Sequence, residues 1–431
     1  MTRSLWRPSA WIGSLLVLVP AVLVGMVVVL NQRDEPDMQS AKPDSAEPTL
    51  QQVERGAYLA RVGNCRSCHT QSGGAEYAGG KGIATPFGVV YGGNLTPDSK
   101  TGIGDWNADQ FWLALHNGRS RDGRLLYPVF PYPQFTRITR ADSDALFAFL
   151  RTVPAVEQAN RAHALRWPYS AQAALAVWRA LFFRPAAYVP RADRSEQWNR
   201  GAYLVQGLGH CAACHSPRNA VGALAAAEPL SGGDMPEQGW YAPSLLDTGE
   251  AGVADGLAAD SVDLLKTGVS THAVASGPMA EVVFASTQYW SDADLRATAT
   301  YLQDLRRTPA SEEMVPPVSP QVMQRGAGLY KHQCAQCHGE QGQGAPGVYP
   351  ALAANRAVTM GPATNLIQVL VRGSFAPVTA GNPRPYGMPP FGHTLNNREL
   401  ADVLSYIRQA WGNRAPEVSE LEVLRARDSR H

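Results

Sequence analysis

The sequence predicts an all-α fold in which three tandem helical domains follow an N-terminal transmembrane helix. Two observations support this prediction. An Arg-Gly-Ala helix start followed by Cys-x-x-Cys-His occurs three times in the 431 residues, a length that suffices for two or three domains. Residues 11–30 carry no charge and include 13 Leu, Ile or Val side chains, so this run is long and apolar enough to cross a bilayer core.

The three cysteine motifs predict three covalently bound haems c. Cys-x-x-Cys-His is the attachment signature of this cofactor, because two thiols one helical turn apart can add to both vinyl groups of one porphyrin. The histidine that follows is then placed to ligate the iron. A thioredoxin-like pair needs no such histidine, and a zinc site needs two more ligands. The predicted thioether residues are Cys65, Cys68, Cys211, Cys214, Cys334 and Cys337, and the predicted iron ligands are His69, His215 and His338.

Composition and charge agree with this interpretation. All six cysteines belong to the motifs, so none is left for a structural disulfide. Covalent haem attachment implies an oxidising compartment outside the cytoplasm, such as a bacterial periplasm. The formal net charge of +1 gives no indication of a nucleic-acid partner. The 40 Gly and 32 Pro predict long loops, as expected where loops enclose a cofactor.

Residues 1–32 are interpreted as an uncleaved anchor in the inner membrane. Arg3 and Arg7 precede the apolar run, which favours a cytoplasmic N-terminus and transfer of the remaining chain to the periplasm. A cleaved signal peptide is the alternative, but such a peptide has a shorter apolar core and a small-x-small cleavage site, whereas this run ends in Val-Val-Val-Leu-Asn-Gln-Arg. Residues 33–50 are rich in Pro, Asp, Glu and Ser and predict a flexible tether.

Each repeat has the same order of predicted parts: an opening helix, the cysteine motif, a loop, a helix that ends in Gly, a second loop and a closing helix. The predicted domains are residues 51–155, 191–308 and 321–412. Their middle helices span 109–118, 261–268 and 365–373, each with a terminal Gly suited to a left-handed cap. This is the plan of class I cytochrome c domains, small all-α units in which the haem forms most of the core.

The closing helices are predicted to start at capping residues and to pack against the opening helices. The predicted caps are Asp142 or Ser143, Ser291 with Asp294, and Asn396 or Asn397 with Glu399. We expect one aromatic of each closing helix to contact the Gly of the facing opening helix. The expected pairs are Gly56 with Phe149, Gly201 with Tyr301, and Gly326 with Tyr406.

Three stretches lie outside the repeats. Residues 156–190 contain a strongly apolar helix at 170–184, with two open interpretations: burial against neighbouring domains, or a shallow membrane contact. The second rests on the aromatic and basic side chains Trp178, Phe182, Phe183, Arg179 and Arg184. Residues 309–320 are a Pro-rich linker, and residues 413–431 are a charged C-terminal tail.

Met279 and Met388 are the predicted second axial ligands of haems 2 and 3. Met388 lies 50 residues after the motif histidine and 18 before the closing aromatic. Met279 lies 64 residues after its motif histidine and 22 before its aromatic. A class I cytochrome supplies its thioether ligand from this register, and thioether ligation raises the reduction potential.

The first repeat has Phe130 in that register, and Phe has no lone pair to donate to iron. We therefore expect haem 1 to differ from the other two. His116 is interpreted as part of a solvated helix face, and His210 as a tolerated polar position beside Cys211.

Several further segments of the chain are specific beyond the cysteine motifs. They are Ala84-Thr-Pro-Phe-Gly88, Asn94-Leu-Thr-Pro-Asp98, Thr101-Gly-Ile-Gly-Asp-Trp106, Tyr127-Pro-Val-Phe-Pro-Tyr132, residues 200–219 and residues 276–283. Through these segments, residues from about 50 to 412 resemble the tri-haem cytochrome c subunits of membrane-bound periplasmic dehydrogenases, such as the alcohol, gluconate, sugar-alcohol and aldehyde dehydrogenases. In many members of that family Met stands where this chain has Phe130, while Phe occurs beside molybdenum-dependent aldehyde or heteroaromatic dehydrogenases.

The resemblance implies a subunit without substrate chemistry of its own. A partner subunit that carries pyrroloquinoline quinone, flavin or molybdopterin would oxidise the substrate, and the haems would pass the electrons to membrane ubiquinone. Two other functions remain open on the residues alone. One is a multi-haem peroxidase that uses haem 1 as an open iron, and the other is the cytochrome c subunit of a terminal oxidase.

Overall fold

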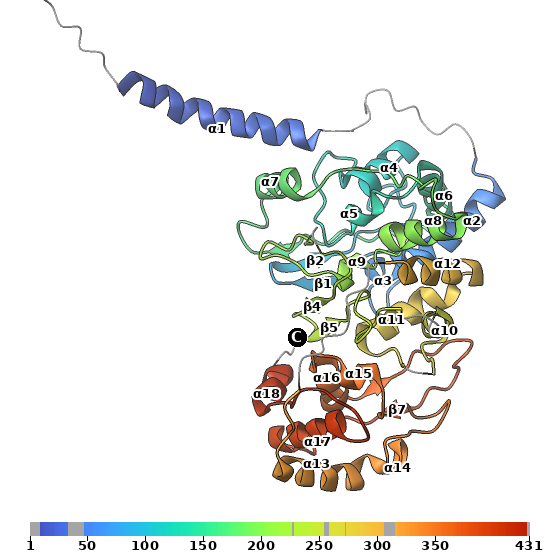
Figure 1. Cartoon of the computed structure of the whole chain (residues 1–431). Coiled ribbons are helices and arrows are strands. Elements are labelled where there is room, and N and C mark those ends of the chain that lie inside the picture. Colours follow the sequence, from blue (N-terminus) through green and yellow to red (C-terminus); the bar gives the residue numbers. More distant parts are fainter. Residues whose placement is uncertain are drawn as a thin grey trace, which may run out of the picture.

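The structure is a computed structural model that describes residues 9–32, 47–225, 228–253, 258–271, 273–305 and 315–428, with only the backbone described at 9–19. Most of the predicted tether and part of the predicted linker lie outside the described residues. The described chain is mostly helical, as predicted. Figure 1 shows the three repeats stacked in chain order, with helix α1 (Ser9–Asn31) projecting from the first.

The helices of each repeat follow the predicted order. The first domain contains α2 (Leu50–Val62), α3 (Cys65–His69), α4 (Ala108–Asn117), α5 (Tyr132–Phe135) and α6 (Arg140–Leu150). The second contains α8 (Glu196–Tyr203), the π-helix η2 (Leu204–Leu208), α9 (Ala212–His215), α10 (Ala258–Thr267), α11 (Gly277–Ala285), the 3₁₀ helix η3 (Thr287–Tyr289) and α12 (Asp292–Gln303). The third contains α13 (Pro320–Gln333), α14 (Ala335–His338), α15 (Arg356–Thr359), α16 (Thr364–Arg372), α17 (Asn397–Gln409) and α18 (Glu420–Asp428).

Three small antiparallel sheets were not predicted. They are β1 (Gly82–Thr85) with β2 (Gly88–Tyr91) and β3 (Ala164–Leu165), β4 (Gly233–Met235) with β5 (Trp240–Ala242), and β6 (Ser374–Phe375) with β7 (Gly387–Met388). The strands have two to four residues each, too few to show a period in the sequence. Gly88 has a φ of +127°, and any side chain there would collide with the backbone of β3.

The opening and closing helices of each domain cross at the predicted glycines. A Cβ atom on Gly56 would lie 2.7 Å from the Cβ of Phe149, and one on Gly201 would lie 2.8 Å from the Cβ of Tyr301. In the third domain, a Cβ on Gly326 would lie 2.6 Å from that of Tyr406. These separations are shorter than real Cβ contacts, so only glycine permits the two backbones to approach this closely. The three expected contacts are confirmed.

The predicted starts of the closing helices are confirmed in two domains and wrong in the first. Ser291 caps α12, and Asn396 caps α17 in a capping box with Glu399. Helix α6 begins three or four residues earlier than predicted from a cap at Asp142 or Ser143, because Thr139 accepts the bond from the backbone N–H of Asp142 and is the cap. The carboxylate of Asp142 is instead occupied by side chains from two other helices, as described below.

The middle helices end in glycine as predicted. Gly118 caps α4 in the left-handed conformation, with φ of 60° and ψ of 37°. Gly268 and Gly373, which follow α10 and α16, also have positive φ, at 81° and 74°. The solvated helix face expected for His116 is wrong: its side chain is buried and its ring stacks on Trp112 at 4.4 Å between centroids.

The segment at 156–190 wraps the first domain. Its helix α7 (Gln172–Phe182) buries Leu175 and Arg179. The side chains of Val177, Leu181 and Phe182 are exposed, so burial against neighbouring domains accounts for only one side of this helix.

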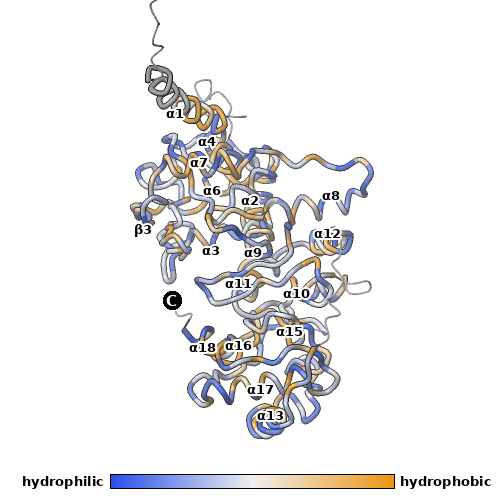
Figure 2. The backbone as a smooth tube through the Cα atoms, turned by 60° about the vertical axis from the view of Figure 1, so that its left-hand side comes forward, coloured by the Kyte–Doolittle hydropathy of each residue, from blue (hydrophilic) through white to orange (hydrophobic). Residues whose placement is uncertain are grey.

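Helix α1 ends against α7, and Figure 2 shows its apolar residues beside those of α7. The Asn31 side chain donates to the Ala176 carbonyl at 2.8 Å and accepts a bond from Arg179 Nε at 2.9 Å. Among the described residues, no helix combines the length and the hydropathy of a membrane span.

The C-terminal stretch is part of the third domain. Helix α18 contacts α16 and α17, and Val423 on it is fully buried. Arg427 donates to the Gly392 carbonyl at 2.6 Å. The sequence predicted a charged tail here, because charged residues are frequent in this stretch. The structure shows that α18 also has an apolar face, which packs on the core of the third domain.

Candidate functional site

Each cysteine motif ends in a histidine whose ring is oriented by a backbone carbonyl. The Nδ1 atom of His69 lies 2.7 Å from the carbonyl oxygen of Gly93, and that of His215 lies 2.7 Å from the oxygen of Pro243. The Nδ1 atom of His338 lies 2.9 Å from the oxygen of Pro350. A carbonyl can only accept, so Nδ1 carries the proton and Nε2 is left with a free lone pair. This is the tautomer that an axial haem ligand requires.

Burial supports the same protonation state. It lowers the pKa of His69, His215 and His338 below the ordinary value for histidine, because the charged imidazolium loses its hydration. The imidazoles are therefore neutral at pH 7, and a neutral ring is the form that coordinates iron. Donor type, tautomer and charge of the three histidines all fit a haem iron.

The six cysteines of the motifs are free thiols and form no disulfides. Burial raises the pKa of Cys65 and Cys211 to about 12 and that of Cys334 to about 11, so these thiols stay protonated. Within the ranges that the structure describes, no group of three or more His, Cys, Asp and Glu side chains is arranged to hold a bare metal ion.

The three carbonyls that orient the histidines were missed in the sequence. In each domain the carbonyl comes at or just after the end of an antiparallel pairing: after β2, after β5, and after the bridge between Ala345 and Tyr349. The unexpected strands therefore position the partner of each histidine. A weak signal was present, because each carbonyl residue is followed two positions later by leucine, at Leu95, Leu245 and Leu352.

The predicted distal residues lie on different elements. Met388 ends β7, faces Ser374 across the strand pair, and packs on the same apolar cluster as Cys334. Met279 lies half-buried in the first turn of α11. Phe130 packs on the cluster that also contacts Cys65, and its ring meets Phe135 at 5.5 Å between centroids.

An ion pair between the opening and closing helices recurs in all three domains and was also missed. Each Arg-Gly-Ala arginine donates from Nε to a buried aspartate of the closing helix. In the first two domains the aspartate lies seven residues before the closing aromatic, and in the third it lies four before, so no constant spacing revealed the pair. The pairs are Arg55–Asp142 at 2.7 Å, Arg200–Asp294 at 2.8 Å and Arg325–Asp402 at 2.6 Å.

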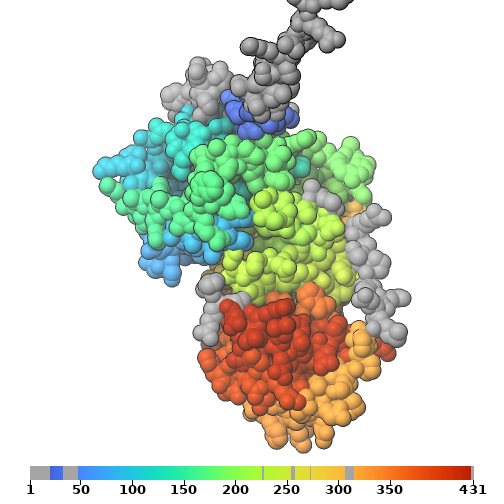
Figure 3. Space-filling model, turned by 90° about the vertical axis from the view of Figure 1, so that its left-hand side faces the viewer, coloured from blue at the N-terminus to red at the C-terminus, as the bar shows by residue number. Residues whose placement is uncertain are grey.

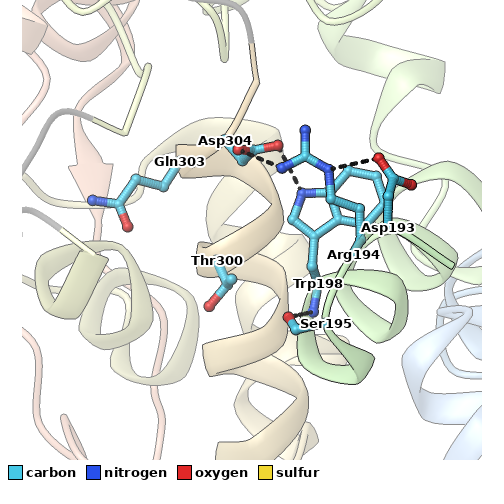
Figure 4. Close-up of a pocket in the computed structure, with 7 residues that line it drawn as sticks. All are labelled: Asp193, Arg194, Ser195, Trp198, Thr300, Gln303 and Asp304. Carbon is cyan, nitrogen blue, oxygen red and sulfur yellow. Dashed lines mark hydrogen bonds and ion pairs between the residues drawn. The ribbon is translucent and has the colours of Figure 1, made fainter. Parts of the chain in front are cut away.

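A surface pocket of about 450 Å³ lies between α8 and α12, and no residue of the cysteine motifs lines it (Figure 4). Its charges are satisfied within the pocket. Arg194 binds Asp304 at 3.1 Å, and the Trp198 indole donates to the same carboxylate at 2.9 Å. These contacts join the start of α8 to the end of α12. Among the lining residues, no nucleophilic side chain is hydrogen-bonded to a base.

Comparison with known proteins agrees with the geometry. The Cytochrome c family model matches residues 53–154 and 323–411. The chain is 37% identical over 394 residues to the cytochrome c subunit of an alcohol dehydrogenase (quinone) from Gluconobacter oxydans, covering 86% of this chain and 82% of that protein. It is 38% identical over 390 residues to the gluconate 2-dehydrogenase cytochrome c subunit of Pantoea cypripedii, covering 86% and 88%.

A third relative is longer than this chain. This relative, a nicotinate dehydrogenase subunit of Pseudomonas putida, is 38% identical over 423 residues, which are 96% of this chain and 34% of that protein. The family-model matches fall on the first and third repeats, and the full-length relatives span the second as well. The chain belongs to the family of cytochrome c subunits that transfer electrons in quinone-linked, membrane-bound dehydrogenases.

Proposed function

We propose that this chain holds three haems c and passes electrons from a dehydrogenase catalytic subunit to ubiquinone in the inner membrane. The observation that carries the proposal is the threefold recurrence of one geometry. Each Cys-x-x-Cys-His motif has a histidine whose Nδ1 is bonded to a backbone carbonyl and whose Nε2 is free.

In this proposal, the six cysteines form the thioether bonds and His69, His215 and His338 ligate the irons. Met279 and Met388 supply the second axial ligand in domains 2 and 3. When bound, each haem supplies a one-electron carrier, and with both axial positions filled it offers no iron site to a substrate. The residues of the chain fix the attachment points, hold each imidazole in one tautomer and enclose the site in apolar side chains.

The partner in this proposal is a separate periplasmic subunit that oxidises the substrate. The names of the relatives support it, since they are cytochrome subunits of dehydrogenases for alcohol, gluconate and fructose. Similar cytochrome subunits thus occur with dehydrogenases that act on different substrates. This is expected if the substrate is determined by a separate subunit that carries pyrroloquinoline quinone, flavin or molybdopterin.

Attachment to the inner membrane is proposed through α1 and the exposed side of α7. Val22, Leu23, Val24, Met26, Val28 and Val29 on α1 are between 48% and 65% exposed, an unusual number of apolar side chains for one helix facing water. On the neighbouring segment Leu181 is 69% and Trp167 is 83% exposed. Arg184 follows α7 and is exposed, which suits the headgroup boundary.

The decisive experiment is purification of the solubilised membrane complex, with mass spectrometry of this chain and activity staining for dehydrogenases. We expect three covalent haems and a co-purifying dehydrogenase subunit whose activity reduces them. Cys214→Ala should break one thioether bond at the second motif only. A mature chain with fewer than three haems would contradict the haem assignment. Co-purification with oxygen-reducing subunits instead would favour the terminal-oxidase alternative.

A further inference from the structure

One apolar cluster spans the first two domains, the second domain has a further smaller cluster of its own, and the third domain has a separate core. One cluster combines Leu59 and Leu146 of the first domain with Leu204, Leu208 and Leu295 of the second, all nearly inaccessible to solvent. The core of the third domain contains only residues from 330 to 426. Figure 3 shows the third domain, in orange and red, as a lobe of its own.

Two tyrosine–aspartate hydrogen bonds cross between the first two domains in a reciprocal arrangement. The hydroxyl of Tyr58 on α2 donates to Asp294 on α12 at 2.6 Å. The hydroxyl of Tyr203 on α8 donates to Asp142 on α6, also at 2.6 Å. Both aspartates are buried, so these charge-assisted bonds are shielded from water.

A single sequence pattern produces both kinds of contact. In Arg-Gly-Ala-Tyr, the arginine binds the aspartate of its own closing helix, while the tyrosine three residues on binds the equivalent aspartate of the other domain. The spacing of three puts both side chains on one side of the opening helix. The third repeat reads Arg325-Gly-Ala-Gly328, so it keeps the internal ion pair and lacks the tyrosine.

The segments directly before the first two cysteine motifs also meet. His210, directly before Cys211, has its Nε2 atom 3.3 Å from the carbonyl oxygen of Gly63, two residues before Cys65. A Cβ on Gly63 would lie 3.0 Å from Leu208 Cδ1, so Leu208 would have to shift to admit a side chain at this position. His210, interpreted from the sequence as a tolerated polar position, thus lies in the contact between the segments that lead into the first two cysteine motifs. These two segments are called the attachment segments below.

The third domain is joined to the second mainly by polar contacts. Asn365 exchanges two hydrogen bonds with the backbone of Tyr241, at 2.9 and 2.7 Å. Arg356 donates to the Gly252 carbonyl at 2.9 Å, and Thr379 donates to the Thr267 carbonyl at 2.9 Å. None of these residues belongs to the apolar clusters of the described chain.

We propose that the first two domains form one rigid two-haem unit in which Tyr58 and Tyr203 are positioning residues. Their hydroxyl bonds fix the attachment segments of haems 1 and 2 relative to each other, and so fix the path between these two carriers. The third domain is a separate folding unit attached to this pair. The inference rests on the proposed haem attachment and goes beyond it by assigning the pairing and the residues that maintain it.

The test compares Tyr58→Phe/Tyr203→Phe with Tyr330→Phe in the full-length holoprotein. Phenylalanine keeps the ring packing, and each aspartate keeps its arginine, so no buried charge is left unpaired. Tyr330 is the matched control, because it lies on the third opening helix and its hydroxyl bonds inside its own domain, to the Gly339 carbonyl at 2.6 Å. Mass spectrometry first establishes that every variant carries three haems.

Circular dichroism in the Soret region provides a readout of haem placement, since two porphyrins held close together give a coupled pair of bands of opposite sign. We expect this couplet in the wild type and in Tyr330→Phe, and its loss in the double variant. Calorimetry should show the first two domains unfolding together. The double variant should lower that transition by about 5–10 °C, whereas Tyr330→Phe should lower only the transition of the third domain.

The possible results distinguish failure of this proposal from failure of the proposed function. An unchanged couplet and an unchanged transition in the double variant would overturn the proposal, as would equal effects in the control. Three separate transitions in the wild type would show that the first two domains are independent. A wild type with fewer than three haems would instead refute the proposed function, which is a distinct result.

Discussion

At the scale of single residues, Phe130 separates the first domain from the others. Its ring packs on the cluster that contacts Cys65, in the register where the other domains offer Met279 and Met388. A phenyl ring cannot ligate iron, and His116 is stacked on Trp112 rather than available as a replacement. With Met279 and Met388 as the proposed ligands of the other two haems, the open iron of the peroxidase alternative would belong to the first site.

We predict that haem 1 is high-spin and has the lowest reduction potential of the three, because it lacks the thioether that raises the potential. Magnetic circular dichroism or electron paramagnetic resonance of the intact oxidised complex measures the spin states. Phe130→Met should convert haem 1 to low spin and raise its potential. Three histidine–methionine signatures in the wild type would refute the prediction.

Asp294 gives a prediction for pH dependence. Burial acts to raise the pKa of this carboxyl, but the bonds from Arg200 and Tyr58 outweigh burial and leave the pKa below its ordinary value of 3.8. A depressed pKa contributes stability that is present above pH 3.8 and is lost as the pH falls through the folded-state value. Thermal unfolding measured from pH 6 to pH 3 should therefore show destabilisation at the acid end that is smaller in Asp294→Asn.

At the scale of elements, the crossing of opening and closing helices depends on one glycine. Helix α13 offers an internal comparison, because it carries two. Gly326 faces the backbone of Asp402, whereas a Cβ on Gly328 would have no atom within 4 Å. The two positions lie on one helix and differ only in what they face.

We predict opposite effects of alanine at these positions. Gly326→Ala should lower the free energy of unfolding of the third domain by about 1–3 kcal/mol or more, because the two backbones must separate. Gly328→Ala should raise it by about 0.5–1 kcal/mol through helix propensity. Denaturant unfolding followed by haem absorbance measures both. Equal effects would show that the helix crossing does not require the glycine.

At the scale of the whole molecule, α1 and α7 give the molecule one apolar end. The docking of Asn31 on α7 fixes where α1 leaves the haem domains, and the exposed Leu181 lies on that same helix. A membrane at this end would face the first domain and leave the third domain at the opposite end of the stack, as Figure 1 shows.

We predict that the mature chain keeps its N-terminus and stays in the membrane fraction after a high-salt wash. A chain without residues 1–32 should still bind vesicles weakly through α7, and Leu181→Glu should abolish this binding. Leu421→Glu is the control, since Leu421 is 52% exposed on α18 in the far lobe. Sedimentation with vesicles measures the binding. A soluble product that begins near residue 40 would show that the N-terminal segment is a cleaved signal peptide.

The sequence by itself determined the repeated elements and the chemistry of each motif. Two thiols and a histidine at fixed spacing define a haem attachment site within one short helix, so no distant residue is needed to recognise it. The same locality explains why two of the three caps and the glycine-ended helices could be predicted. The glycine contacts join helices that lie far apart in the chain, and they could be predicted because the three repeats share the same order of elements.

Only the tertiary structure decided the rest, because the remaining contacts join residues far apart in the chain. The carbonyls of Gly93, Pro243 and Pro350 reach their histidines across loops of different lengths. Tyr58 and its partner Asp294 are separated by 236 positions. A backbone carbonyl has no sequence signature, and a tyrosine on a helix surface looks the same whether it faces water or another domain. The sequence therefore defined three similar sites, and the packing of helices made two of them a pair.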